Sequence, residues 1–171
     1  MNDQHVAAPV GRQLANEETK SGLYAGLDIG GTKTAVLVVD RSSKVRGRGT
    51  APTNTESPQQ LVDGISDAVV ETLARCGTTT ADLLAVGAGV PGMVDPQTGI
   101  VRLAVNLNLE EYALGDALSR RFGVPVALEN DVRTAALGAF RWLNNHSATR
   151  YMANLSIGTG IAAGLVIDGR L

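Results

Sequence analysis

Two apolar runs, each interrupted by a glycine-rich loop, constrain the fold of this chain most strongly. Residues 26–40 (GLDIGGTKTAVLVVD) align without a gap on residues 154–168 (NLSIGTGIAAGLVID), and seven of the fifteen positions are identical. Each run is typical of a strand, a loop and a second strand, that is, a β-hairpin. Chance similarity between two apolar hairpins is the alternative. The absence of a gap and the shared glycine and aspartate positions favour a duplicated unit.

The segments between these hairpins alternate between strands and helices. Strands are expected near residues 24–29, 35–39, 45–51, 84–90 and 124–128, and helices near residues 57–76, 113–122 and 130–142. The continuously apolar run 35–39 is typical of a strand covered on both faces. Three initial strands, followed by alternating helices and strands, predict an α/β fold with a mixed sheet, an opening three-strand meander and flanking helices.

We expect three parts along the chain. Residues 1–22 are polar and contain no apolar core, so they are not a secretory signal and are expected to form a flexible lead-in. Residues 23–148 hold the α/β elements, and residues 149–171 hold the second hairpin. Because the sequence stops directly after this hairpin, we expect it to begin a second domain that is truncated.

Composition excludes several classes of protein. A net charge of −2 and an aromatic content of 4% argue against a nucleic-acid partner. The single cysteine, Cys76, excludes a disulfide framework and a zinc site built from several cysteines. Residues 151–167 carry no charge, but they include polar residues and glycines and fall short of a membrane span. We therefore expect a cytoplasmic protein without a membrane partner.

The first glycine loop indicates phosphate binding. Dinucleotide and Walker loops open a helix, whereas Gly30, Gly31, Thr32 and Lys33 are followed by an apolar strand and therefore form a hairpin turn. Backbone N–H groups in such a turn can bind an anion, and the missing side chains let an oxygen approach closely. Asp28, just before the loop, is a candidate ligand for Mg²⁺. A plain tight turn is the alternative, but the second loop, residues 156–160, favours phosphate binding.

Basic residues on the third strand have a simpler interpretation. Lys44, Arg46 and Arg48 share one face of the run 45–51. A phosphate-binding patch is one possibility, and a solvated strand face is favoured over it.

Four segments, in this order along the chain, resemble the sugar kinases of the ROK family (repressors, open reading frames and kinases). They are LDIGGTKTAVLV, VGAGVPGMVDPQTGIV, ENDVRTAALGAF and LSIGTGIAAG, and the resemblance runs over about residues 23–171. It implies the actin-like, hexokinase-like (ribonuclease H-like) fold. It also implies ATP-dependent, glucokinase-like phosphorylation of a hexose or amino sugar, with sugar and nucleotide as the partners.

The resemblance further implies roles for individual residues. Asp131 would be the general base for the attacking sugar hydroxyl, and Asn130 and Asn106 would each bind a further hydroxyl. The phosphates of ATP would be held by two loops, namely Gly30, Gly31, Thr32 and Lys33 in the first and Gly158, Thr159 and Gly160 in the second, with Mg²⁺ near Asp28. The alternative for Asn130 or Asp131 is a helix N-cap, and the two roles are compatible.

The chain also departs from the family pattern. Leu109, in the loop expected to face the sugar, stands where the family often has an aromatic residue. The family's structural zinc site and adenosine pocket would lie beyond Leu171, so no zinc site is expected within this chain, and little kinase activity is expected from it alone.

Two other functions remain open, together with one prediction about assembly. One alternative is a sugar-responsive ROK transcriptional regulator that lacks its DNA-binding module, since 22 residues before Leu23 are too few for one. The other is a remnant that binds ligand without catalysis. The apolar strands of the second hairpin are marginal alone and predict either packing on the first domain or a homo-oligomer.

Overall fold

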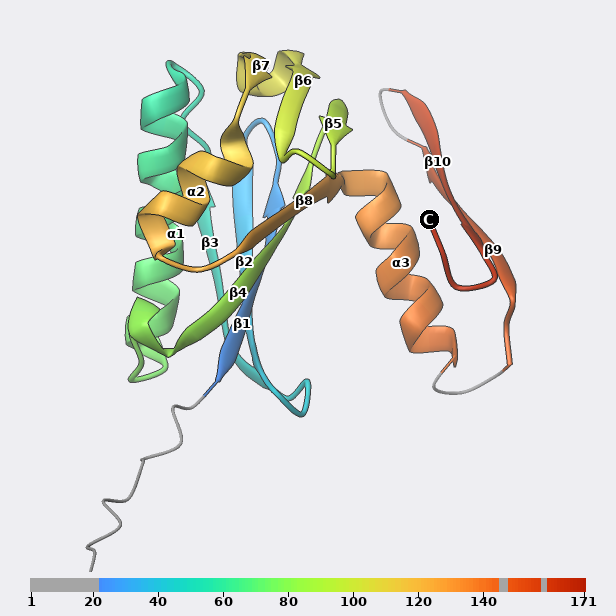
Figure 1. Ribbon diagram of the computed structural model, residues 1–171, viewed down its shortest axis with the longest axis horizontal. Coiled ribbons are helices and arrows are strands. Elements are labelled where there is room, and N and C mark those ends of the chain that lie inside the picture. The colour runs from blue at the N-terminus through green and yellow to red at the C-terminus, as the bar shows by residue number, and fades with distance from the viewer. Residues whose placement is uncertain (1–21, 145–147, 158–159) are drawn as a thin grey trace, which may run out of the picture.

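The computed structural model describes residues 22–144, 148–157 and 160–171, and its largest sheet has five strands in the order β3-β2-β1-β4-β8 (Figure 1). The strands are β1 (Leu23–Ile29), β2 (Lys33–Asp40), β3 (Val45–Pro52), β4 (Leu83–Val90) and β8 (Val126–Asn130). The first three form an antiparallel meander, whereas β4 is parallel to β1 and β8 is parallel to β4. The predicted α/β fold with a mixed sheet and an opening meander is confirmed.

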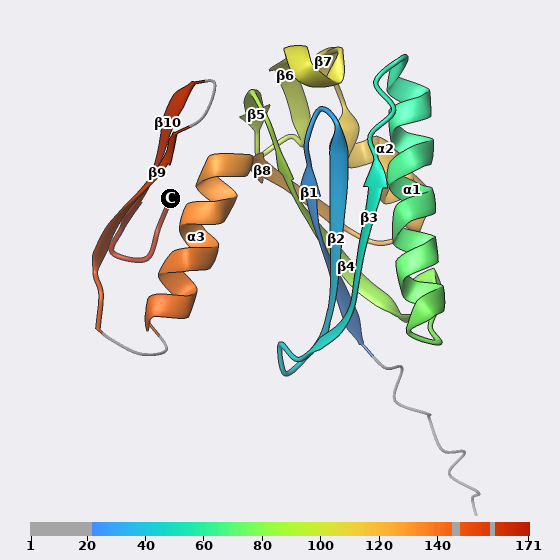
Figure 2. The same ribbon diagram turned by 180° about the vertical axis from the view of Figure 1, so that it is seen from behind.

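Two helices cover one face of this sheet. Helix α1 (Pro58–Arg75) begins after Ser57, whose side chain accepts a hydrogen bond from the Gln60 N–H, and helix α2 (Leu114–Phe122) ends at Gly123 in the left-handed conformation. Both helices lie on the same side of the sheet in Figures 1 and 2. One face of α1 is buried, and so are alternate residues of β1. Together they contribute these residues to the core: Leu23, Ala25, Leu27, Ile29, Leu61, Ile65, Ala68 and Val69.

The other face of the meander is less covered than the sequence predicted. On β2 the residues alternate between buried and half-buried, and Ala35, Leu37 and Val39 are half-buried. In the part of the chain that the structure describes, the remaining long helix (Asp131–Asn144) packs mainly on the second hairpin and on β4. The prediction that β2 is covered on both faces is therefore wrong for the described residues.

A small three-stranded sheet lies beyond the end of β4. It contains β5 (Met93–Asp95), β6 (Ile100–Ala104) and β7 (Leu109–Tyr112), which pair in that order and antiparallel. Two short 3₁₀ turns complete this half of the chain, one at Thr80–Asp82 and one, η2, at Val105–Leu107 between β6 and β7. The small sheet thus carries the segment in which the sequence placed a sugar-binding asparagine.

Helix α3 (Asp131–Asn144) follows β8 directly and separates the main sheet from a second hairpin (Figure 1). This hairpin contains β9 (Tyr151–Ile157) and β10 (Ile161–Ile167). Val166 of β10 is buried against Ala136 and Phe140 of α3 and forms a separate small core. Among the described residues, none of the helices combines the length and the apolar character needed to cross a bilayer.

The two hairpins share their strand order but not their pairing register. The gapless sequence alignment places Leu155 where Leu27 stands and Gly164 where Val36 stands. Leu27 pairs with Val36, whereas Leu155 pairs with Ala163, one residue away from the expected partner. Three residues, instead of four, separate the last paired residues of the second hairpin, and this shorter connection moves the register. Because side chains alternate across a strand, a shift of one residue exchanges the two faces of β9.

Candidate functional site

The first glycine loop is a hairpin turn at the end of β1. The Gly30 N–H donates to the carbonyl oxygen of Lys33 at 2.9 Å, and the Thr53 N–H donates to the carbonyl oxygen of Thr32 at 3.1 Å. The side chains of Thr32 and Lys33 are exposed. Since a strand follows the turn, the structure confirms the hairpin and excludes a Walker or dinucleotide loop at this position.

Gly31 brings this turn into contact with the small sheet. A methyl group at Gly31 would lie 2.9 Å from the backbone oxygen of Asn106 and 3.0 Å from its Cβ atom. The loop predicted to hold phosphates and the asparagine predicted to hold the sugar are therefore neighbours, although they are far apart in the sequence.

Asn106 lies in the short turn η2, after the exposed Val105 and before the buried Leu107. Ala104 and Leu107 are 1% and 0% exposed, whereas Asn106 itself is exposed. Leu109, which the sequence placed in the loop facing the sugar, is 2% exposed and belongs to the core. The side chain of Leu109 is therefore buried in the core and does not face a ligand in this conformation.

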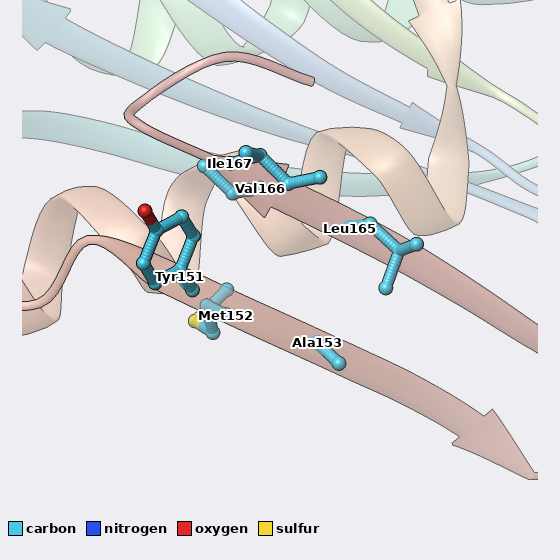
Figure 3. A pocket seen from close by; sticks show the side chains of 6 residues that line it. All are labelled: Tyr151, Met152, Ala153, Leu165, Val166 and Ile167. Atoms are coloured by element: carbon cyan, nitrogen blue, oxygen red, sulfur yellow. The ribbon is translucent and has the colours of Figure 1, made fainter.

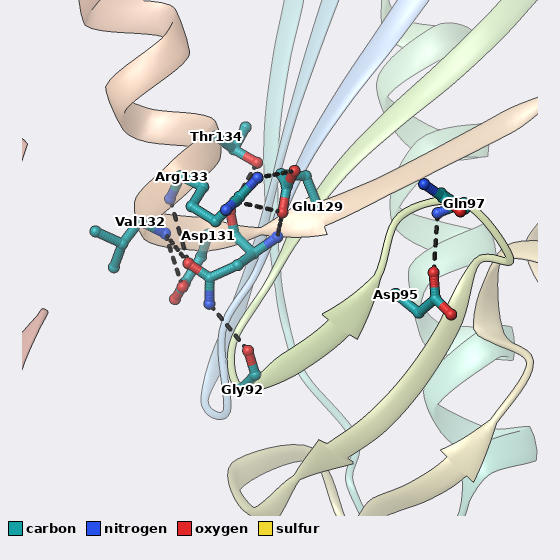
Figure 4. Close-up of polar contacts among 9 residues, drawn as sticks. Gly92, Asp95, Gln97, Glu129, Asp131, Val132, Arg133 and Thr134 are labelled. Atoms are coloured by element: carbon teal, nitrogen blue, oxygen red, sulfur yellow. Dashed lines mark hydrogen bonds and ion pairs between the residues drawn. The ribbon is translucent and has the colours of Figure 1, made fainter. Parts of the chain in front are cut away.

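Arg102, on the middle strand of the small sheet that carries Asn106, forms ion pairs with both neighbouring strands. Its guanidinium contacts Glu111 at 2.6 Å and Asp95 at 3.1 Å, which raises the pKa of Arg102. The pKa of Asp95 is lowered, first by a hydrogen bond from the Thr98 side chain and also by the backbone N–H groups of Thr98 and Gln97 and by Arg102. Figure 4 shows the contact between Asp95 and Gln97 at the turn that precedes β6.

Asn130 is the N-cap of α3, and Asp131 is the first residue of the helix. The Oδ1 atom of Asn130 accepts hydrogen bonds from the Val132 N–H at 3.0 Å and the Arg133 N–H at 3.2 Å. Asp131 is half-buried, and its Oδ1 atom accepts the Val132 N–H at 2.8 Å. Of the two residues offered as a cap, Asn130 therefore takes that role, and no described side chain forms an ion pair with Asp131.

Gly92 links Asn130 to the small sheet, a contact that sequence reasoning missed. The Nδ2 atom of Asn130 donates to the Gly92 carbonyl oxygen at 3.0 Å. Gly92 has a φ of +92°, and a side chain there would overlap the carbonyl oxygen of Leu103. Gly92 and Asn106 also line one apolar pocket of about 240 Å³ together with Pro91, Met93, Leu103, Ala104 and Val105. The only signal in the sequence was the turn formed by Pro91 and Gly92 after a buried strand.

Glu129 was also missed, and it contacts the junction between β8 and α3. Its Oε1 atom accepts the Asn130 N–H at 2.8 Å and lies 3.0 Å from the Nε atom of Arg133 (Figure 4). The Thr134 hydroxyl donates to the carbonyl oxygen of Asn130 at 2.9 Å. The N–H group, the side chain and the carbonyl oxygen of Asn130 are therefore all hydrogen-bonded, which fixes the backbone next to Asp131. An acidic residue four positions before an arginine was the available signal.

Asp28 and Asp131 lie at the same edge of the main sheet. Asp28 pairs with Gly89 of β4, and a methyl group at Gly89 would lie 3.3 Å from the Cα atom of Asp131. No group of three or more acidic, histidine or cysteine residues suited to a metal occurs among the described residues. Magnesium typically binds one or two carboxylates and completes its shell with substrate phosphates and water. The exposed carboxylate of Asp28 fits an ion that arrives with a nucleotide.

The second glycine loop is only partly described. Gly158 and Thr159 lie outside the described residues, as do His5 and His146, whereas Gly160 is exposed, and no atom lies within 4 Å of the place that a methyl group at Gly160 would take. The ends of β1 and β9 that lead into the two loops point toward the same, upper end of the molecule in Figure 1, with α3 between them. The structure does not bring Gly160 into contact with the first loop.

The second hairpin carries a separate apolar pocket on its outer side. Its volume is about 340 Å³, and it is lined by Tyr151, Met152, Ala153, Leu165, Val166 and Ile167 (Figure 3). None of the residues predicted to bind sugar or phosphate lines this pocket, so we exclude it from the site.

Comparison with known proteins gives the relationships of the chain. The family model described as the ROK family matches residues 24–171. A glucokinase from Streptomyces coelicolor is 35% identical over 150 residues, which are 88% of this chain and 45% of the relative. A xylose repressor from Caldicellulosiruptor bescii is 29% identical over 116 residues, which are 68% of this chain and 29% of the relative.

A solved structure agrees with these relationships. The ROK family glucokinase from Streptomyces griseus, in complex with glucose and AMPPNP, matches with a TM-score of 0.76 and 33% identity, over 88% of this chain and 46% of that chain. The actin-like, hexokinase-like fold class predicted from the sequence is confirmed. The chain spans about 45% of the length of the glucokinase relatives that it matches.

Proposed function

This chain belongs to the ROK family, and on that premise we propose that it forms part of a cytoplasmic sugar kinase that uses ATP to phosphorylate a hexose or amino sugar. The observation that carries the proposal is a chain of contacts. Gly31 approaches Asn106, Asn106 and Gly92 line one pocket, and Gly92 accepts a hydrogen bond from Asn130, the residue before Asp131. The glucose and AMPPNP bound by the glucokinase from Streptomyces griseus support it.

Asp131 is proposed as the general base. Its carboxylate would accept the proton of the sugar hydroxyl, while the hydroxyl oxygen forms a bond to the γ-phosphorus and the bond to ADP breaks. Asn130 provides the cap, and only the Oδ1 atom of Asp131 accepts a hydrogen bond from a described residue, so its Oδ2 atom can accept the proton of the substrate.

Asn130 is proposed to bind a neighbouring hydroxyl as a donor. Its Oδ1 atom already accepts two backbone N–H groups, and one Nδ2 hydrogen is given to Gly92. The second Nδ2 hydrogen has no partner among the described residues, so it can donate to a sugar oxygen. A hydroxyl bound in this way keeps its own hydrogen free. Asn106, which lies between two strands of the small sheet, would bind a further hydroxyl of the sugar.

The phosphates of ATP are proposed to lie between the two loops. Gly30, Gly31, Thr32 and Lys33 would contribute from the first loop, and Gly158, Thr159 and Gly160 from the second. Asp28 would hold Mg²⁺, which supplies positive charge that neutralises the phosphate oxygens. We also propose that residues 23–148 form one domain and that residues 149–171 begin another.

Titration of the isotope-labelled chain, followed by NMR, tests this proposal. Glucose and N-acetylglucosamine are expected to shift the signals of Asn106, Asn130 and Asp131, and MgATP those of the loop at Gly31. Asp131→Asn keeps the shape of the side chain and is expected to retain the sugar response. If no signal at these residues responds to either ligand at ~10 mM, ten times the usual upper limit of KM, the proposal is wrong.

Kinase activity is the second measurement. A coupled ADP-release assay is expected to give turnover far below the usual kcat of roughly 10 s⁻¹, because the chain spans about 45% of the length of its glucokinase relatives. Turnover at ordinary rates would contradict this expectation. In that case Asp131→Asn should lower kcat by a factor of about 10² to 10⁴.

A sugar-responsive regulator is the second candidate, favoured by the similarity to a xylose repressor. A regulator needs the sugar contacts at Asn106 and Asn130 but does not need the phosphate loop. The same titration separates the two functions. A response to sugar without any response of the first loop to MgATP favours the regulator, and a response to both ligands favours the kinase.

A further inference from the structure

Gly31 and Gly30 differ in what occupies the space of their missing side chains. A methyl group at Gly31 would meet the backbone oxygen and the Cβ atom of Asn106, at 2.9 and 3.0 Å, whereas one at Gly30 would meet the Lys33 carbonyl oxygen within the same turn, at 3.0 Å. The conformation of the backbone does not explain Gly31, because its φ lies outside the left-handed region. The close approach of Asn106 is therefore a reason for glycine at position 31 that a strained turn does not supply.

Asn106 cannot move away from the turn without disturbing the core. Its neighbour Leu107 is 0% exposed, and Ala104 before it is 1% exposed. Asn108, which ends η2, is in the left-handed conformation at φ 53°. Protein interiors are packed to crystal-like density, so buried anchors of this kind leave little room for a shift. A methyl group at position 31 would displace either the turn or the backbone of Asn106.

We propose that Gly31 is a positioning residue, whose missing side chain lets the phosphate loop and Asn106 pack as one unit. The inference rests on the proposed function and adds a connection between its two binding regions. The turn that would hold the phosphate chain cannot shift without moving the residue that would hold the sugar. Gly31 thereby fixes the distance between donor and acceptor without needing to touch the sugar.

Gly31→Ala tests this connection, with Gly26→Ala, on β1 before the turn, as the control. A methyl group at Gly26 would meet only the Leu37 carbonyl oxygen, at 3.9 Å. In the 171-residue chain, Gly31→Ala is expected to shift the backbone and side-chain NMR signals of Asn106. It is also expected to weaken glucose binding about tenfold, which corresponds to ~1.4 kcal/mol, because a displaced Asn106 no longer holds its hydroxyl in the right geometry. Gly26→Ala is expected to change neither.

Two outcomes separate the inference from the proposed function. Unchanged Asn106 signals in Gly31→Ala overturn the inference, whether or not glucose binds. If the wild-type chain binds neither glucose nor MgATP, the proposed function fails, while the Asn106 signals still decide the positioning role.

A double-mutant cycle covers the case in which Gly31→Ala destabilises the fold. Asn106→Gly removes the Cβ atom that the new methyl group would meet at 3.0 Å. The double variant is therefore expected to recover part of the stability lost in Gly31→Ala, measured by urea unfolding. Strictly additive losses overturn the inference.

Discussion

At the scale of single residues, Asn130 serves both the fold and the candidate site. Its oxygen caps α3, and its nitrogen bonds the Gly92 carbonyl oxygen across to the small sheet. The same amide therefore sets the start of the helix and the position of the neighbouring Asp131. Substitutions at Asn130 can separate these contributions, because a serine keeps a capping oxygen but lacks the amide nitrogen.

Asn130→Ala is expected to lower the free energy of unfolding by about 1 kcal/mol, within the usual range for loss of an N-cap. Asn130→Ser keeps a capping oxygen and is expected to retain most of that stability. Both variants lack the Nδ2 donor and are expected to weaken sugar binding alike. Urea unfolding and glucose titration measure the two effects. Equal stability losses in the two variants would show that Asn130 is not the cap.

Residues of the candidate site could be selected from the sequence, but the structural role of each one could not. Asn130 and Asp131 could be selected by resemblance, yet which of them caps α3 depended on where the helix begins, to within one residue. Gly92 could not be selected, because it contributes a backbone carbonyl that any residue possesses. Gly31 was selected as a phosphate-binding glycine, while its contact with Asn106 required the tertiary fold.

At the scale of elements, the stability of the small sheet is expected to depend on pH through the carboxylate of Asp95, which contacts Arg102. The lowered pKa of Asp95 means that this carboxylate contributes stability above its ordinary value of 3.8, and that the contribution is lost as the pH falls through the lower folded value. Asp95→Asn is expected to reduce stability at pH 7, and the difference from wild type should shrink below about pH 4. Urea unfolding across this range checks the sign.

Glu110→Gln provides the control for that pH series. Glu110 is an exposed carboxylate on β7 of the same sheet. Glu110 forms no ion pair among the described residues, so its substitution is expected to lack the stability loss of Asp95→Asn at pH 7. A wild-type-like pH profile for Asp95→Asn would contradict the role assigned to Asp95.

The attachment of the second hairpin to α3 depends on one close approach. A methyl group at Gly164 would lie 2.6 Å from the Cβ atom of Ala136 and 2.7 Å from the carbonyl oxygen of Val132. Gly164→Ala is therefore expected to destabilise this contact by about 1–3 kcal/mol, as in other overpacked interiors. Gly138→Ala, on α3 with no atom near the new methyl group, is expected to be neutral or stabilising. Hydrogen exchange of β10 should increase only in Gly164→Ala.

The order of the elements could be predicted because hydrophobic periodicity and capping residues are local. The helix expected near residues 57–76 is α1, Pro58–Arg75, with Ser57 as its N-cap. The cover over each face of the sheet could not be predicted, since the apolar run of β2 does not specify what packs on it. The register of the second hairpin also escaped prediction, because it depends on the connection between β9 and β10 and not on their composition.

At the scale of the whole molecule, the outer face of the second hairpin exposes an extended set of apolar side chains. Its apolar side chains point away from α3, and Ile157 and Ile161 are 76% and 79% exposed. Tyr151 and Leu165 lie on the same outer side (Figure 3). Exposed apolar strands of this kind favour association between chains.

Size-exclusion chromatography of the full chain is expected to show self-association, in contrast to a chain ending at Arg150. The shortened chain also uncovers Phe140, so Leu165→Lys, which places a charge on the outer face, is the sharper comparison. Equal monomer behaviour of the full chain and of both altered chains would contradict the prediction.

The one-residue difference in register limits how the two glycine loops can be compared. A residue-by-residue map drawn from the first loop onto the second assigns Leu155 to the inward side of its ladder, whereas it points outward. Mutational results obtained in one loop therefore cannot be transferred to the other by counting along the chain. If the two hairpins arose by duplication, their first strands now bury opposite faces, and each loop needs its own set of variants.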